Sequence, residues 1–304
     1  MSSLTDPNVS HVRVGVFLPQ LRMDFATIEA RVHAAEEVGF DSAWFMDHVA
    51  VPMAREHDCF EAWTLVSALA ARTSRIRLGH LVLCGPFRHP VLLAKMAATL
   101  DVISGGRVEL GIGWGSVTEE LRDYGFGDEP AAVRAARLAE TLEILELLFT
   151  GDAVDYQGRY YQLEGAICRP RPVNGRLPIH LGGAGRTLTM PLVTRFADWW
   201  NCPSYAVAQL GELLPLAGDR TRLSVQHPIG LAPNSASRQA IVDQAERRFG
   251  SWGGLIAGTP DEVAEALRAE VALGVELFVL QFSDFGQPET LELFANEVLP
   301  GLAR

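Results

Sequence analysis

An aspartate and a histidine stand side by side at positions 47 and 48, directly after the apolar run 43–46. A carboxylate beside an imidazole at the C-terminal end of a strand can hydrogen-bond the edge of a ligand ring and move a proton near neutral pH. The alternative is that the pair only caps a turn. His48 and Asp47 are therefore the first candidates for catalysis.

Two glycine-rich segments are candidates for holding a planar or phosphorylated ligand. Residues 111–116 read Gly-Ile-Gly-Trp-Gly-Ser, and glycines such as Gly111 and Gly113 let a backbone approach a ligand, although they also serve tight turns. A dinucleotide fingerprint would need glycine where this chain has Ser116. In the second segment, between an expected strand and helix, N–H groups and the helix dipole favour phosphate over a plain turn. Its candidate ligands are Gly182, Gly183, Gly185, Arg186 and Thr187.

Other candidates also follow the ends of expected strands, where the active site of an α/β barrel lies. Gln20 comes after the first strand and can hydrogen-bond a ligand, although a plain turn is an equal alternative. Trp114, inside the first glycine-rich segment, is a candidate for the substrate pocket. Leu81 and Val82 lie in a run that by itself reads as a buried strand with its exit loop.

Composition limits the classes of partner. The chain has 304 residues, 48% of them hydrophobic and 21% charged, with a formal net charge of -11. Nucleic acid and anionic membranes are not expected partners, because either would be repelled. Lys95 is the only lysine, so Schiff-base chemistry is not expected. The scattered cysteines have no metal-binding spacing and no apolar run has the length of a membrane span, so we expect a cytosolic protein without a metal.

Short β-branched runs alternate with longer helical patterns, and this alternation must position the candidate residues. Strands are expected at 12–18, 42–46, 76–83, 108–112, 179–181, 199–201, 224–231 and 277–282. Helices are expected at 25–38, 59–72, 90–104, 130–149, 186–196, 237–249, 260–273 and 288–302.

This order of elements predicts an α/β fold, a single (β/α)8 TIM barrel that spans residues 1–304 as one domain. The same alternation also builds a doubly wound open sheet, but about eight strands over this length favour closure. We expect residues 1–11 to be a flexible N-terminus, residues 151–175 to form a hairpin insertion, and residues 203–222 to form a lid or a second insertion.

Taken in order, these places and their neighbours resemble the luciferase-like flavin monooxygenase and deazaflavin-dependent oxidoreductase superfamily over nearly the whole chain. No single motif is specific, but the ordered set is. The segments that carry the resemblance are Gly15–Pro19, Asp47-His48, Glu61–Thr64, Arg75–Gly79, Arg88–Pro90, Thr99–Gly113, Tyr124-Gly125, Gly158–Tyr161, Gly182-Gly183 and Ala197–Asn201.

The segment Leu-Asp-x-x-Ser-Gly-Gly-Arg at 100–107, together with Asp47-His48, looks most like the branch that uses the deazaflavin coenzyme F-420. The resemblance implies that Asp47 contacts the deazaflavin and that His48 lies near the transferred hydride. It also implies a non-prolyl cis peptide at about Leu81-Val82 that backs the ring, and a glycine-bound phosphate.

The implied function is hydride transfer between coenzyme F-420 and a small-molecule substrate. The implied partners are a second copy of the chain in a homodimer and a separate enzyme that reduces the cofactor. A two-component FMN monooxygenase and a non-catalytic flavin-binding protein are the alternatives.

Two departures from the resemblance bear on the substrate. Many relatives read Gly-x-Gly-Ala-Gly-Trp where this chain has tryptophan two positions earlier, at Trp114, so the pocket is expected to differ in shape. Sugar-phosphate enzymes of this branch hold the phosphate largely with lysines, and this chain has only Lys95. The substrate is therefore not carried over.

Overall fold

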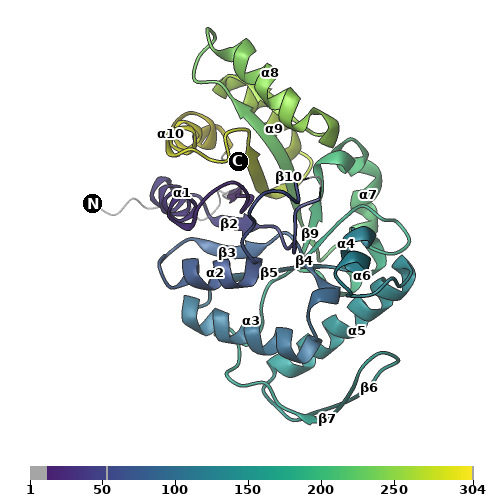
Figure 1. Ribbon diagram of the computed structural model, residues 1–304. Helices are drawn as coiled ribbons and strands as arrows, with labels where there is room; N and C mark the ends of the chain where they lie inside the picture. The colour runs from purple at the N-terminus through teal and green to yellow at the C-terminus, as the bar shows by residue number, and fades with distance from the viewer. Residues whose placement is uncertain (1–11, 53, 303–304) are drawn as a thin grey trace.

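Parallel strands close into an eight-stranded barrel in the computed structural model, which describes residues 12–52 and 54–302 (Figure 1). Strands β10 and β12 pair with each other and complete the ring through β9 and β1 respectively, so the sheet has no open edge within it. The (β/α)8 fold is thereby confirmed and the open sheet is excluded. The barrel strands are β1 Arg13–Phe17, β2 Ser42–Phe45, β3 Arg77–His80, β5 Val108–Gly113, β8 Ile179–Gly182, β9 Trp199–Cys202, β10 Arg222–Leu231 and β12 Val275–Phe282.

Helices cover the outside of the ring, and local signals set several of their ends. Helix α1 begins after Asp24, whose carboxylate accepts the N–H of Thr27, and α3 begins at Pro90, as predicted. The longer helices are α1 Phe25–Val38, α2 Ala62–Ala70, α3 Pro90–Ser104, α5 Ala131–Phe149, α7 Leu210–Ala217, α8 Arg238–Phe249 and α9 Pro260–Val271. The shorter ones are α4 Thr118–Asp123, α6 Met190–Phe196 and α10 Pro288–Leu293, which continues as a π-turn and a 3-10 turn to Leu302.

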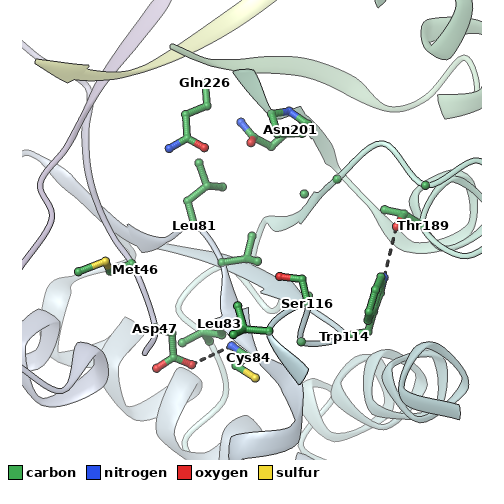
Figure 2. A pocket seen from close by; sticks show the side chains of 18 of the residues that line it. Met46, Asp47, Leu81, Leu83, Cys84, Trp114, Ser116, Thr189, Asn201 and Gln226 are labelled. Atoms are coloured by element: carbon green, nitrogen blue, oxygen red, sulfur yellow. Dashed lines mark hydrogen bonds between the residues drawn. The ribbon is translucent and has the colours of Figure 1, made fainter. Parts of the chain in front are cut away.

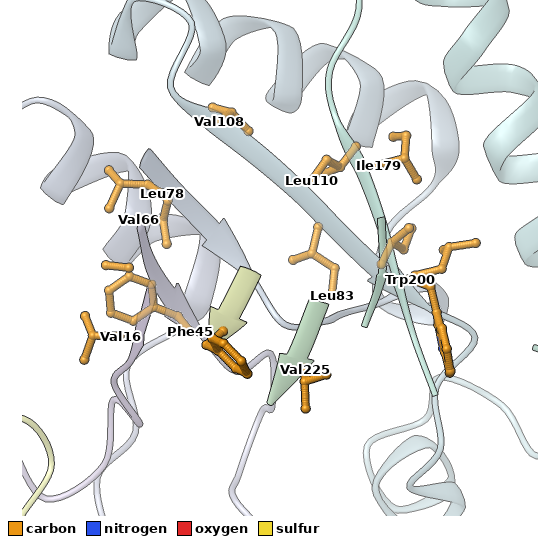
Figure 3. Close-up of a cluster of buried hydrophobic side chains, with 14 of the residues drawn as sticks. Val16, Phe45, Val66, Leu78, Leu83, Val108, Leu110, Ile179, Trp200 and Val225 are labelled. Atoms are coloured by element: carbon orange, nitrogen blue, oxygen red, sulfur yellow. The ribbon is translucent and has the colours of Figure 1, made fainter. Parts of the chain in front are cut away.

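The main core lies between the strands and this helical layer. Outward-facing strand residues such as Phe45, Leu78, Leu110 and Val225 are fully buried there (Figure 3). Burial of apolar area on this scale is the main driving force for the fold. None of the helices within the described residues combines the length and apolarity needed to cross a membrane.

The inside of the barrel at its N-terminal end is filled by paired charges. Glu109, only 1% exposed, accepts hydrogen bonds from Arg13 at 2.8 Å and Arg77 at 2.5 Å. Its second oxygen lies 2.7 Å from Nε2 of the buried His180. The ring of His180 is stacked on Trp199, with the centroids 5.5 Å apart.

The expected strand at 76–83 is interrupted. Strand β3 stops at His80, and a short strand β4, Leu83–Cys84, resumes pairing with β5. The bond between Leu81 and Val82 is cis, at the position that the family resemblance implied.

Several other boundaries differ from the prediction. Helix α2 begins at Ala62 instead of residue 59, because Glu61 caps it by accepting the N–H groups of Trp63 and Thr64. Helix α6 begins at Met190, after a turn at 186–189. The pattern gave no signal for α4 or for the short strand β11, Ile256–Gly258, which pairs with β10.

Two segments had been expected to stand apart from the barrel. Residues 151–175 contain the antiparallel hairpin of β6 Val154–Gln157 and β7 Gln162–Ala166, which extends beside α5 (Figure 1). Residues 203–222 contain a 3-10 turn, Ser204–Gln209, and α7, and connect β9 to β10. The expectation of a flexible N-terminus at 1–11 lies outside the described residues.

Candidate active site

A cavity of about 470 Å³ opens at the C-terminal ends of the barrel strands. Six neighbouring strands or strand exits contribute to its wall, as Figure 2 shows for most of them. This is the end of the barrel at which (β/α)8 enzymes place their active sites. The residues contributed by these strands are Met46, Leu81, Gly113, Gly182, Asn201 and Gln226.

His48 lines this cavity and is held by a carboxylate from a distant segment. Its Nδ1 lies 2.8 Å from Oε2 of Glu120, a residue of α4 that is 3% exposed. The other oxygen of Glu120 accepts the N–H groups of Val49 at 2.7 Å and Ala50 at 3.3 Å. Glu120 therefore holds both the imidazole and the loop that carries it, and leaves Nε2 of His48 for a ligand.

Asp47 lies at the edge of the cavity and is engaged by a guanidinium. Its two oxygens accept from Arg88 at 2.6 and 3.0 Å, and one also accepts the N–H of Cys84 at 2.8 Å (Figure 2). Burial alone would lower the pKa of Arg88, but its bonds to Asp47 and the charges of Asp47 and Glu61 raise it. These three bonds fix Asp47 so that it can orient the loop, and Oδ1, which accepts one bond from Arg88, can accept a second from a ligand.

The cis peptide unit forms an apolar wall of the cavity. Leu81 and Val82 both line it, and in space the side chain of Val82 packs against Gly113 and Gly182 of two neighbouring strands. A Cβ atom added at Gly113 would stand 2.9 Å from the Val82 side chain, and one at Gly182 would stand 3.3 Å from it. The absence of side chains at these two positions is what lets the wall take this shape.

The second glycine-rich segment forms another side of the cavity. Gly182, Gly183 and Gly185 line it, and the N–H groups of Ala184 and Gly185 donate to no other residue in the described part of the chain. Thr189 closes this side and accepts a hydrogen bond from Nε1 of Trp114 at 3.3 Å (Figure 2). Such a loop can receive an anionic oxygen.

Four candidate residues do not line this cavity, and Thr187 is one of them. The buried amide of Gln20 bonds to the backbone of Met46. Arg186 pairs with Glu212 at 2.5 Å on the surface. A Cβ at Gly111 would stand 1.9 Å from the carbonyl oxygen of His80, so this glycine makes room for the end of β3. None of the four has a place in the wall of this cavity.

The sequence analysis did not single out several residues that line the cavity or support it. Glu120 is one of many acidic residues in helices, and only its burial distinguishes it. Asn201 ends a segment that carries the family resemblance but was not named as a site residue, and Gln226 comes from a strand with no motif. Tyr205 comes from the stretch expected to be a lid or an insertion. The alternation of inward-facing residues in β9 and β10 is the one signal that pointed to the two amides.

The thiols near the site are poor nucleophiles. Burial, together with the charges of Asp47 and Glu120, raises the pKa of Cys84 to about 12. Burial and the same two charges raise the pKa of Cys59 to about 11. Within residues 12–52 and 54–302, no group of three or more histidine, cysteine, aspartate or glutamate side chains is arranged to hold a metal ion. His48 is therefore the cavity residue best suited to exchange a proton.

Known proteins are similar to this chain in sequence and in architecture. "F420-dependent glucose-6-phosphate dehydrogenase" of Microbacterium testaceum is 29% identical over 334 positions, which cover 95% of this chain and 95% of the relative. The F420-dependent tetrahydromethanopterin reductase of Methanopyrus kandleri superimposes with a TM-score of 0.79 at 21% identity, covering 96% of this chain and 99% of that one. The EDTA monooxygenase of Chelativorans superimposes with a TM-score of 0.82 at 17% identity, covering 96% of this chain and 93% of that one.

At these identities the two solved structures bear on the fold alone. The family assignment comes from the sequence profile described as luciferase-like monooxygenase, which matches residues 9–217. This match covers well over half of the chain, including the barrel from its first strand to β9 and every residue of the cavity except Gln226. The chain therefore belongs to the luciferase-like monooxygenase family.

Proposed function

We propose that this protein is an oxidoreductase that transfers a hydride between coenzyme F-420 and a small organic substrate. The relative that aligns over 95% of both chains is named as F420-dependent. The observation that carries the proposal is that His48 shares one cavity with an apolar wall and a glycine loop. This combination suits a proton-exchanging group next to a flat, phosphorylated cofactor.

The residues of the cavity fit a deazaflavin in two respects. Leu81 and Val82 offer an apolar surface for a flat ring, and Gly113 and Gly182 keep the surroundings of Val82 free of side chains. The loop 183–185 offers backbone N–H groups for a phosphate oxygen. When bound, F-420 supplies hydride exchange at ring carbon 5, which amino-acid side chains do not supply.

The side chains of the protein then have separate tasks. His48, bound to Glu120 through Nδ1, exchanges the substrate's hydroxyl proton through Nε2. Asp47, held by Arg88, orients the loop and accepts a hydrogen bond from the cofactor ring. The neutral Cys84 thiol takes no part, since its pKa of about 12 keeps it protonated.

The runner-up is a two-component FMN monooxygenase, which the same apolar wall and glycine loop would also fit. Equilibrium fluorescence titration of the purified chain with both cofactors separates the two. We expect F-420 to bind at least about tenfold more tightly than FMN, a difference of roughly 1.4 kcal/mol. Equal or tighter FMN binding would favour the monooxygenase, and F-420 binding without turnover of any acceptor would indicate a non-catalytic flavin-binding protein.

We also propose a homodimer in the cytoplasm and a separate enzyme that renews the reduced cofactor. These proposals rest on the family resemblance. Sedimentation equilibrium tests the dimer, because a monomer at concentrations well above those in the cell would contradict it.

A further inference from the structure

A second cavity, of about 380 Å³, adjoins the first at the same end of the barrel. The two share Pro203, Tyr205 and Gln226 in their walls. We propose that this second cavity, the side chamber, binds the body of an uncharged substrate, an alcohol or a carbonyl compound with an apolar ring or alkyl group. Its identification as a substrate chamber rests on the function proposed above.

The charges around the two cavities favour an uncharged ligand. Among the described residues, no lysine or arginine lines either cavity, and the only ionisable carboxylates and imidazole are Asp47, Glu120 and His48 of the first. Without a cation in its wall, the side chamber has nothing to neutralise the phosphate or carboxylate group of an anionic substrate. The wall of the side chamber is uncharged throughout and consists of Pro203, Ser204, Tyr205, Gln226, Pro228, Ser251, Trp252 and Gln281.

The arginine closest along the chain to this wall is already engaged. Arg248 donates to the carbonyl oxygen of Ser283 and lies over the ring of Phe285, 4.5 Å from its centroid. It therefore does not supply the cation that an anionic substrate would need.

Two amides in the side chamber have no partner in the described part of the protein. Gln281 of β12 is 3% exposed, and neither its side chain nor that of Gln226 on the adjacent β10 makes a hydrogen bond there. Both amides line the chamber and have no partner among the described residues around them, so a ligand or a water in the chamber can complete their hydrogen bonds. An amide carries both donor and acceptor atoms, which match a hydroxyl as well as a carbonyl oxygen.

The wall that carries Trp252 is held in place, so the chamber is preformed. Nδ1 of the buried His227 lies 2.6 Å from the carbonyl oxygen of Gly254, and its Nε2 lies 2.8 Å from Oε2 of Glu270. Gly254 has a φ of 62°, and a Cβ there would stand 2.5 Å from the carbonyl oxygen of Ser204. The loop of Trp252 therefore packs directly against the segment that carries Tyr205.

Binding is tested first on the whole chain with and without F-420. Cyclohexanol, cyclohexanone and benzyl alcohol serve as uncharged probes, glucose serves as a neutral polyol, and glucose 6-phosphate as its anionic partner. Isothermal titration gives each dissociation constant independently of turnover. We expect at least one of the three uncharged ring compounds to bind at about 1 mM or tighter, and glucose 6-phosphate to bind at least about tenfold more weakly.

Variants then locate the bound probe. Gln281→Leu should weaken the best probe at least about fivefold while the dissociation constant of F-420 stays within twofold, and Gln239→Leu on the exposed face of α8 should change neither. Trp252→Ala, at a half-exposed position, should weaken the probe similarly and serves as the second variant if Gln281→Leu does not fold.

The outcomes separate the chamber from the cofactor proposal. The chamber would be overturned if glucose 6-phosphate bound more tightly than the ring compounds, if no ring compound bound, or if Gln281→Leu and Trp252→Ala bound the probe as tightly as the unmodified chain does. If a ring compound binds in a Gln281- or Trp252-dependent manner while F-420 does not bind, the chamber stands and the proposed cofactor fails.

Discussion

The two ends of the barrel use their inward-facing residues in opposite ways. At the N-terminal end Glu109 gathers two arginines and a histidine, and Arg222 lies over Trp199 at 4.0 Å while it pairs with Glu276 at 2.8 Å. At the C-terminal end the corresponding positions are glycines, an apolar cis peptide unit and amides. The charges of the first end are paired within the protein, although Nδ1 of His180 has no hydrogen-bond partner among the described residues, and the second end leaves several polar groups open to a ligand.

This difference separates stability from function within one sheet. Paired, buried charges at the N-terminal end hold the strands in register but offer nothing to a substrate. The C-terminal end is open to a cavity, and His48 places an imidazole in the wall of that cavity. Substitutions at the N-terminal end should therefore lower the unfolding free energy, and substitutions at the C-terminal end should lower turnover or ligand affinity.

The largest expected effect is the loss of stability in Glu109→Gln. Removal of the carboxylate leaves Arg13, Arg77 and His180 without their buried partner, which should cost about 3–5 kcal/mol of unfolding free energy. Glu276→Gln, at a half-exposed ion pair, should cost no more than about 1 kcal/mol. Urea denaturation checks both, and equal stabilities would remove the distinction between the two ends.

The unfolding free energy at acid pH should show the contribution of Glu109 and its partners. Burial alone would raise the pKa of Glu109, but the hydrogen bond and charge of His180, followed by Arg77 and Arg13, lower it well below its ordinary value of 4.5. Because the folded pKa is the lower one, this stabilisation is present above pH 4.5 and is lost as the pH falls towards the folded pKa. The wild-type protein should lose more unfolding free energy than Glu109→Gln over this range.

The next effect concerns turnover at the other end. His48→Ala should lower kcat by about a hundredfold, roughly 2.7 kcal/mol, while the dissociation constant of F-420 and the unfolding free energy stay near their original values. His57→Ala, whose imidazole pairs with Glu56 at 3.3 Å outside the cavity, is the matched control. Unchanged turnover in His48→Ala would remove this residue from the mechanism.

A smaller effect is expected at the glycine loop. Gly185→Asp should weaken F-420 binding by about 2 kcal/mol, roughly thirtyfold, because a carboxylate would stand where the phosphate is proposed. Gly185→Asn has the same shape without the charge and accounts for crowding against Thr189, which a Cβ would approach to 3.1 Å. Equal losses in both variants would place the phosphate elsewhere.

The smallest effect tests the support of the imidazole. Glu120→Gln should lower kcat by roughly fivefold, about 1 kcal/mol, with little change in KM, because His48 keeps a neutral hydrogen bond in place of a charged one. Glu119→Gln, exposed on the same helix, should leave kcat unchanged. A change in KM alone would show that Glu120 shapes the pocket instead of positioning His48.

Local signals made part of this molecule predictable. The ends of α1 and α3 follow from Asp24 and Pro90, and the two helices begin and end where the pattern placed them. The interruption of β3 left no such mark, because the close approach of the His80 carbonyl oxygen to Gly111 joins two strands that lie far apart in the sequence. Helix α7 was missed because its pattern is short and contains Pro215.

The sequence by itself determined the order of strands and helices. That order also places Asp47-His48 and the Gly182 loop at the same end of the barrel, because the C-terminal ends of parallel barrel strands share one edge. Only the tertiary structure decided which side chains meet across that edge, such as His48 with Glu120, 72 residues further along. It also decided that Gln226 and Gln281 both face inward, because a shift of one residue in a strand's register would turn its side chains to the other face.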